Sequence, residues 1–376
     1  SYIYEWFSNL FQISAIPVSD LPANFNPSYG ITVITDPIFN TLIKTPLIIA
    51  DTLSAFLIYK ISIFYTKDYS ISKSSAALYF FSPIVIWISA AWGQYDSLAV
   101  LFTILSFYLL LVSKRIVFSS LALYIAFFIK IYPIIFIIPI IISILRFEKD
   151  RQWKMMSFIV ILIPLSIYLI FFDGIAIYSI AEGLLFPSNF FFTSGFGLTY
   201  WSVVLITPID IFWSTLISKI VMIVLVSLSF YYVIKRAKTQ FDVVIFGSLF
   251  FTIALFLSLT IVSEQRSLIL LALLTLGTIY RPSLRNYIIF LSITAFLYTQ
   301  KNFPFYLLPL ASRFQDSFSF LFAYVAQFVN RSSDFISPTP NSGYILFIIG
   351  SSFSILLIML YWKIIKSNNI STIEKI

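Results

Sequence analysis

Long apolar runs separated by short polar gaps fill most of this chain. A helix needs about 20 apolar residues to cross a bilayer, and lipid satisfies no backbone polar group, so each run is predicted to be a helix. The predicted spans lie near 44–65, 75–91, 97–113, 116–130, 131–146, 155–172, 218–236, 243–262, 267–280, 286–300 and 341–362. The pattern predicts an all-α polytopic membrane protein, with about eleven transmembrane helices forming one domain over residues 1–376. The runs 116–130 and 267–280 are too short for a full bilayer unless the bilayer thins or the helices sit inside a bundle.

The polar gaps between the runs alternate in charge. One set is basic and comprises Lys67/Lys73, Lys114/Arg115, Lys149/Arg151/Lys154, Lys235/Arg236/Lys238, Arg281/Arg285 and Lys363/Lys366. The other set carries carboxylates beside polar and aromatic residues, at 92–96, 173–182 and 263–266. Since basic loops stay on the cytoplasmic side, the acidic set is predicted to lie on the opposite face. The same face receives three long predicted external loops, 1–43, 173–217 and 301–340.

Composition narrows the chemistry that the chain can perform. Hydrophobic residues make up 60% of it and charged residues only 11%, well below the roughly 25% charged of an average soluble domain. Cysteine and histidine are both absent, which excludes disulfides, Cys/His metal sites, a Cys nucleophile and a His base. The net charge of +8 comes mostly from the inner gaps, so membrane topology explains it and nucleic-acid binding is not expected. No cofactor is predicted, although a divalent cation stays open.

The segment Trp92-Gly93-Gln94-Tyr95-Asp96-Ser97 is predicted to form a tight outer turn between two helices. Asp96 has two interpretations. It can cap the following helix by accepting hydrogen bonds from its first N–H groups. Alternatively, it can line the rim of a cavity with Gln94 and Tyr95, as polar ligands of a sugar or its phosphate.

Two more candidates for substrate binding lie near the outer ends of predicted helices. Asp51 is about two turns into its helix, at a depth where a carboxylate marks a functional site by default; the alternative is a structural partner. Lys130, followed by Tyr132, is either a point charge for the donor's phosphate or a lysine that snorkels to the interface.

The turn Glu264-Gln265-Arg266 supplies the last candidates. Arg266 offers a bidentate fork for phosphate, and Glu264 and Gln265 can orient it or bind sugar hydroxyls. The alternative is a surface ion pair, which contributes little to stability.

Taken together, several pieces resemble the GT-C superfamily of polyprenyl-phosphate-sugar-dependent glycosyltransferases. These pieces are Lys44-Thr45-Pro46, Ala50-Asp51-Thr52, residues 76–86, the turn 92–97, Lys130-Ile131-Tyr132-Pro133 with Pro139, residues 197–201 and Glu264-Gln265-Arg266. The chain is most similar to the branch of GPI mannosyltransferases and archaeal multi-pass mannosyltransferase-like proteins. The resemblance implies transfer of a hexose, with mannose expected, from a dolichyl- or polyprenyl-phosphate-linked donor. The implied acceptor is a glycolipid or lipid-linked glycan on the outer face, and the implied displacement inverts the anomeric carbon.

The resemblance also implies a catalytic carboxylate in the first external loop. In the family an acidic residue precedes a Tyr/Trp-containing stretch like Tyr2–Trp6, so we expect an upstream helix and an Asp just before Ser1. Within the chain, Glu5, Asp20 and Asp36 are the fallback candidates for the base that deprotonates the acceptor. Lys130 or Arg266 is expected to stabilise the departing phosphate.

Two other classes of protein stay open. A transporter or lipid flippase would show internal repeats and helices broken near the midplane, and a non-catalytic membrane subunit would need no base. The composition favours the plasma membrane of an archaeon or bacterium over an ER membrane, with the active side opposite the cytoplasm.

Overall fold

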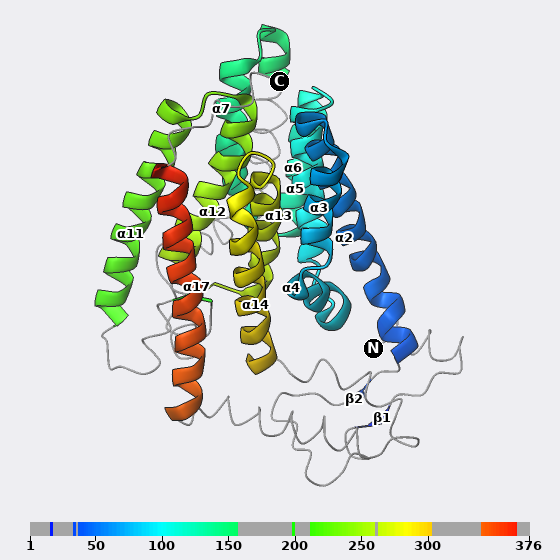
Figure 1. Ribbon diagram of the computed structural model, residues 1–376, viewed down its shortest axis with the longest axis vertical. Coiled ribbons are helices and arrows are strands. Elements are labelled where there is room, and N and C mark those ends of the chain that lie inside the picture. Colours follow the sequence, from blue (N-terminus) through cyan, green and yellow to red (C-terminus); the bar gives the residue numbers. More distant parts are fainter. Residues whose placement is uncertain are drawn as a thin grey trace, which may run out of the picture.

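Helices that run back and forth between two ends form the described part of the chain (Figure 1). The computed structural model describes residues 16–17, 33–34, 37–156, 198–199, 211–259, 262–302 and 340–366. The α-helices are α2 (Pro37–Thr66), α3 (Tyr69–Phe80), α4 (Pro83–Ile86), α5 (Asp96–Leu111), α6 (Ile116–Ile129), α7 (Ile137–Phe147), α11 (Ile211–Tyr231), α12 (Gly247–Ser258), α13 (Ser267–Gly277), α14 (Arg285–Asn302) and α17 (Pro340–Lys366). Shorter 3₁₀ and π segments are η2 (Trp87–Trp92), η3 (Tyr132–Phe136), η5 (Tyr232–Arg236), η6 (Asp242–Phe246), η7 (Glu264–Arg266) and η8 (Pro282–Leu284). Two-residue strands β1 (Ile16–Pro17) and β2 (Val33–Ile34) pair antiparallel.

The number of spans differs from the prediction. Among the described residues, three helices are long and apolar enough to cross a membrane, at 39–66, 216–236 and 344–366, and a bent pair makes a fourth. Four shorter apolar helices accompany them, so eleven full spans are not confirmed. The predicted span 155–172 and most of the three long loops lie outside the described residues.

Two predicted runs are interrupted helices. The run 75–91 breaks where α3 ends and α4 begins at Pro83, and the two parts are bent by 48°. Proline lacks an N–H and clashes with the preceding turn, so it fits the first turn of α4 and not the middle of a helix. The run 131–146 begins as η3, with Pro133 near its start, and continues as α7. The second interruption adjoins a pocket, since η3 contributes Tyr132, Ile135 and Phe136 to its lining.

Two short helices occupy the interior of the bundle. All eleven residues of α13 are buried, as is every residue of α12 except Leu255. At 1.5 Å per residue, α13 is about 17 Å long and α2 about 45 Å. Because protein surrounds α13, its length need not match the bilayer, which explains why the run 267–280 is so short.

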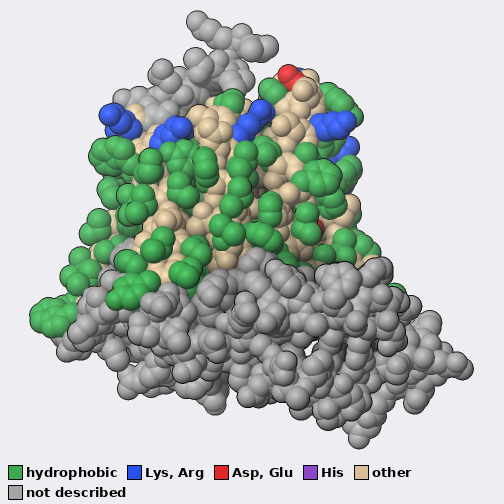
Figure 2. Space-filling view, turned by 60° about the horizontal axis from the view of Figure 1, so that its bottom comes forward, with side chains coloured by type: hydrophobic (Ala, Val, Ile, Leu, Met, Phe, Trp, Pro, Cys, Tyr) green, Lys and Arg blue, Asp and Glu red, His purple; other side chains and the backbone are tan. Residues whose placement is uncertain are grey.

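The outer surface of the long helices is apolar (Figure 2). Exposed side chains include Phe56 of α2, Ile223 of α11, and Ile355 and Trp362 of α17, each more than half exposed. A surface of this kind faces lipid, since a soluble domain rarely exposes large contiguous apolar patches. The chain is therefore a helical membrane protein.

Basic side chains gather at one end of the helices. The six basic gaps of the sequence fall at the ends of α2, α5, α7, α13 and α17 and at η5, the upper end in Figure 1. Figure 2 shows Lys and Arg side chains along one edge of the apolar surface. The opposite helix ends carry Asp96, Lys130 and Arg266.

Candidate functional site

An ion pair closes the open end of the α5–α6 hairpin. Nζ of Lys130 lies 3.0 Å from Oδ2 of Asp96, and the two side chains are 22% and 1% exposed. Asp96 is the first residue of α5, and Lys130 caps the C-terminal end of α6. A carboxylate at a helix N-terminus and an ammonium at a C-terminus both complement the helix dipoles. The hairpin thus stabilises the two opposite charges side by side.

The ammonium of Lys130 connects this hairpin to two further segments. It lies 4.0 Å from the centre of the Tyr95 ring and donates to Oε1 of Gln265 at 3.5 Å. Tyr95 belongs to the predicted outer turn, and Gln265 belongs to η7 before α13. The packing therefore brings together three of the sequence-derived candidate groups, which are up to 170 positions apart in the chain.

Arg266 brings a second positive charge to the site. It interacts electrostatically with Asp96 and with Tyr132, and burial lowers the pKa of its guanidinium while the Asp96 carboxylate opposes that shift. Among the described residues, no hydrogen bond or ion pair reaches this guanidinium, and the hydroxyl of Tyr132 is buried without a partner. Asp96, Lys130 and Arg266 together carry a net charge of +1. The site therefore combines an excess of positive charge with one unpaired buried hydroxyl, which suits an anion.

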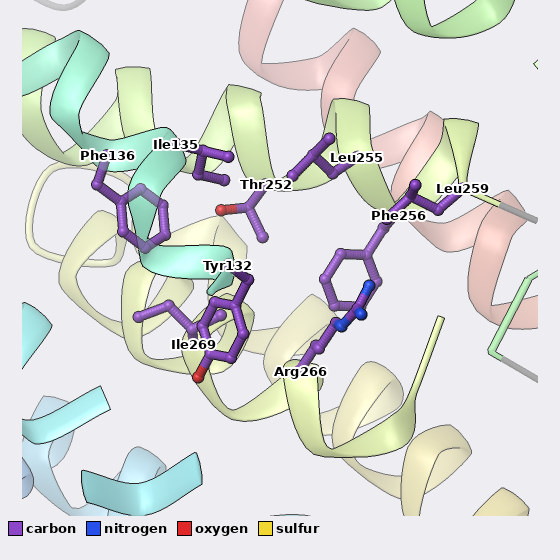
Figure 3. Close-up of a pocket in the computed structure, with 9 residues that line it drawn as sticks. All are labelled: Tyr132, Ile135, Phe136, Thr252, Leu255, Phe256, Leu259, Arg266 and Ile269. Atoms are coloured by element: carbon purple, nitrogen blue, oxygen red, sulfur yellow. The ribbon is translucent and has the colours of Figure 1, made fainter. Parts of the chain in front are cut away.

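A largely apolar pocket begins at these donors. It lies between η3, α12, η7 and the start of α13, and it is lined by Tyr132, Ile135, Phe136, Thr252, Leu255, Phe256, Leu259, Arg266 and Ile269. Figure 3 shows Tyr132 and Arg266 along one edge, with apolar side chains of η3 and α12 around the rest. The arrangement suits a molecule with an anionic head and an apolar tail.

The turn that carries Asp96 depends on a glycine and a lysine. Gly93 has φ +79°, and a Cβ there would meet Cε of Lys44 at 3.0 Å. Lys44 reaches over from α2 and donates from Nζ to the carbonyl of Ala91 at 2.5 Å. Glycine adopts this left-handed conformation without strain, which is why it commonly ends a helix. Lys44 was not among the predicted site residues, although Lys44-Thr45-Pro46 was one of the pieces that resembled the GT-C superfamily.

Asp51 lies apart from these contacts. Its Oδ1 accepts a hydrogen bond from the hydroxyl of Tyr79 at 3.1 Å, and no ion pair joins it to Lys130 or Arg266. Gln94 makes a backbone hydrogen bond to Ile88, while Glu264 is 5% exposed and accepts a hydrogen bond at its carbonyl from Ser267. The fallback bases Glu5, Asp20 and Asp36 lie outside the described residues. Within the described ranges, no group of three or more His, Cys, Asp or Glu side chains could hold a metal ion.

Comparison with known proteins gives one match. The family model described as GPI transamidase subunit PIG-U matches residues 28–218, just over half of the chain. A search of curated proteins finds no match. The matched region includes Asp51, Asp96 and Lys130 and ends before Arg266.

Proposed function

The chain belongs to the family of the GPI transamidase subunit PIG-U, and from that premise we propose that it is a membrane glycosyltransferase acting on lipid-linked sugars. The donor is a hexose, with mannose expected, carried on a polyprenyl or dolichyl phosphate. The acceptor is a glycolipid or lipid-linked glycan. The observation that carries the proposal is the site itself: Arg266 lines an apolar pocket and interacts electrostatically with Asp96, which is paired with Lys130.

Phosphate binding rests on Arg266 and Lys130. The guanidinium has five N–H donors in a planar fork, which suits phosphate oxygens. Lys130, which pairs with Asp96, adds a second positive charge. Because the site is partly shielded from water, these charges stabilise the negative charge that develops on the departing phosphate. Asp96 fixes the position of Lys130 and limits the net charge of the empty site.

We propose that the lipid end of the donor packs against the apolar side chains at the mouth of this pocket. Ile135, Phe136, Leu255 and Phe256 line it, and burial of apolar chain surface contributes about 25 cal/mol per Å². A phosphate at Arg266 with its first isoprene units at the mouth of this pocket leaves the sugar directed away from the lipid chain. The rest of the chain stays in the bilayer.

The reaction is a single displacement at the anomeric carbon. The acceptor hydroxyl loses its proton to a carboxylate, its oxygen forms the new bond to the anomeric carbon, and the bond to the phosphate oxygen breaks, with that oxygen keeping the electron pair. Asp96 is paired with Lys130, so we assign the base to the first external loop, where Glu5, Asp20 and Asp36 are the candidates. The active side then lies opposite the cytoplasm, in the plasma membrane of an archaeon or bacterium.

A second candidate function is a non-catalytic subunit that holds a glycolipid. The family match favours it, since the matched family is described as a subunit of GPI transamidase. Both candidate functions use the same phosphate and lipid contacts. They differ in whether the chain itself breaks the bond between sugar and phosphate.

An assay of sugar transfer and an assay of polyprenyl-phosphate binding distinguish the two candidate functions. The full chain is reconstituted with synthetic radiolabelled polyprenyl-phosphate mannose and a membrane glycolipid extract, and transfer to lipid is counted. Binding of polyprenyl phosphate is followed in parallel by quenching of tryptophan fluorescence. Transfer supports the enzyme, binding without transfer supports the subunit, and the absence of both overturns the proposal.

A further inference from the structure

The carboxyl group of Asp51 is buried at the meeting point of four helical segments. Asp51 is 3% exposed, and α2 packs there against α3, η2 and α5. The hydroxyl of Tyr79 in α3 donates to Oδ1 at 3.1 Å. Ser89 of η2 and Ser97 of α5 also lie near this carboxyl group, but Oγ of Ser97 makes no hydrogen bond of standard geometry to it. One carboxylate is thus surrounded by hydroxyl oxygens from three neighbouring segments.

Two oxygens of this cluster lack hydrogen-bond partners. Oδ2 of Asp51 and Oγ of Ser97 are fully buried and unpaired among the described residues. Ser97 is 0% and Ser89 3% exposed, and the hydroxyl of Ser89 donates to the carbonyl of Val85, which leaves its oxygen lone pairs free to bind a ligand. Buried polar atoms are almost always paired in folded proteins, so unpaired ones point to a missing partner.

No positively charged side chain balances Asp51 within the described ranges. The ion pair of the structure joins Lys130 to Asp96, and Lys44, two turns away on α2, donates to Ala91 instead. An ionised carboxylate without a counter-charge is very costly in an apolar interior. The charge must therefore be balanced by a bound cation or by a proton.

The backbone around Ser89 has two features that are typical of cation sites, a π-helical turn and a nearby break in a helix. Ser89 lies in the π-helix η2, which follows the break between α3 and α4. π-helical turns occur often at functional sites, and interrupted membrane helices provide oxygen ligands for small cations in other proteins. Carboxylate and hydroxyl oxygens are ligands for hard cations, and the single carboxylate charge matches a monovalent ion.

We propose that Asp51, Tyr79, Ser89 and Ser97 form a binding site for a small monovalent cation, a sodium ion. The ion binds Oδ2 of Asp51 and Oγ of Ser97, the two unpaired oxygens, with the hydroxyl oxygens of Ser89 and Tyr79 completing its surroundings. It joins α2 to η2 and α5, and so holds the segment that ends in the Gly93 turn. This site is independent of the proposed sugar transfer, because it involves neither Lys130 nor Arg266.

Thermal unfolding of the purified full chain tests the site. Unfolding is followed by tryptophan fluorescence in NaCl, KCl or choline chloride at equal ionic strength and constant pH. Sodium is expected to raise the midpoint temperature in a saturable way, by about 3 °C at a concentration 100 times its Kd. Ser97→Ala should shift the half-maximal concentration upward about tenfold or more, as expected for a lost ligand.

Asp51→Asn should abolish the sodium effect while keeping the fold, since the neutral amide has the same shape and needs no counter-charge. Asp150→Asn is the matched control: it makes the same change on an exposed residue and should retain the full sodium effect. Equal midpoints in the three salts would overturn the proposal. So would a midpoint that ignores sodium but varies with pH only when Asp51 is present, because a proton would then balance the carboxylate.

Discussion

Lys130 and Asp96 form an ion pair of 3.0 Å at the open end of one helical hairpin, where α5 begins and α6 ends. The carboxylate is almost completely buried and the ammonium mostly so. The pair places a fixed dipole at the end of the bundle opposite the basic gaps, near Arg266, which interacts electrostatically with Asp96. Because the two buried charges balance each other, replacing either residue alone leaves the other charge unpaired and lowers the stability of the fold.

Removing one partner of this pair should destabilise the chain strongly. Lys130→Ala leaves the Asp96 carboxylate buried without a partner, at an expected cost of ~3–5 kcal/mol. The double variant Asp96→Asn/Lys130→Gln should cost much less, because no unpaired charge remains. Chemical denaturation of the full chain in detergent measures both. Equal losses for the single and double variants would show that the pair is not coupled.

Gly93→Ala should destabilise the outer turn. The new Cβ would meet Lys44 at 3.0 Å, and the residue would keep φ +79°, which together should cost roughly 1–2 kcal/mol. Ala90→Ser, an exposed change on the adjacent π-helix, is the control and should stay within about 0.5 kcal/mol. A neutral Gly93→Ala would mean that the turn has another conformation.

Filling the apolar pocket should weaken donor binding. Leu259→Trp places a larger ring at the pocket, so that about two methylenes of the lipid chain lose their contacts. At ~0.8 kcal/mol per methylene this raises KM for polyprenyl-phosphate mannose ~10-fold, with little change in kcat. Leu228→Trp, on the exposed face of α11, should leave KM unchanged. A pocket variant with wild-type KM would place the lipid chain elsewhere.

The basic end of the helical bundle and the end that carries Asp96, Lys130 and Arg266 should face opposite sides of the membrane. The chain has no cysteine, so single cysteines report position without background. Cysteines at Ser70 and Ser113 should react with an impermeant reagent only from the cytoplasm, and cysteines at Ser188 and Ser263 only from outside. Labelling of positions 113 and 263 from the same side would contradict the topology and the assignment of the site to the outer face.

The charge pattern of the sequence predicts which residues share a helix end, and hence which of them can meet. It is sufficient to group Asp96, Lys130 and Arg266. It does not predict that Asp51, on the same predicted side, bonds to Tyr79 instead, because that depends on how α2 rotates against α3. Nor does it separate the buried α12 and α13 from lipid-facing helices, since helices apolar on all sides carry no periodic signal.

The two helix breaks could have been predicted from the sequence, because Pro83 and Pro133 lie inside the predicted runs. Each proline lies in the first turn of the helical segment that follows the break. The role of Lys44 could not be predicted, since its contact with Ala91 joins positions 47 residues apart.

Binding of polyprenyl phosphate to an Arg266 variant tests the central claim most directly. With the full chain in nanodiscs, Arg266→Ala should weaken binding of the phosphate ~10-fold or more, for the loss of at least one charge-assisted hydrogen bond. Arg266→Lys should recover only part of the affinity, because the bidentate fork is gone. Arg151→Ala, which removes an exposed positive charge from a basic gap, should bind as the wild type does. If Arg266→Ala binds polyprenyl phosphate with wild-type affinity, the phosphate does not bind at this site and the account of its function is wrong.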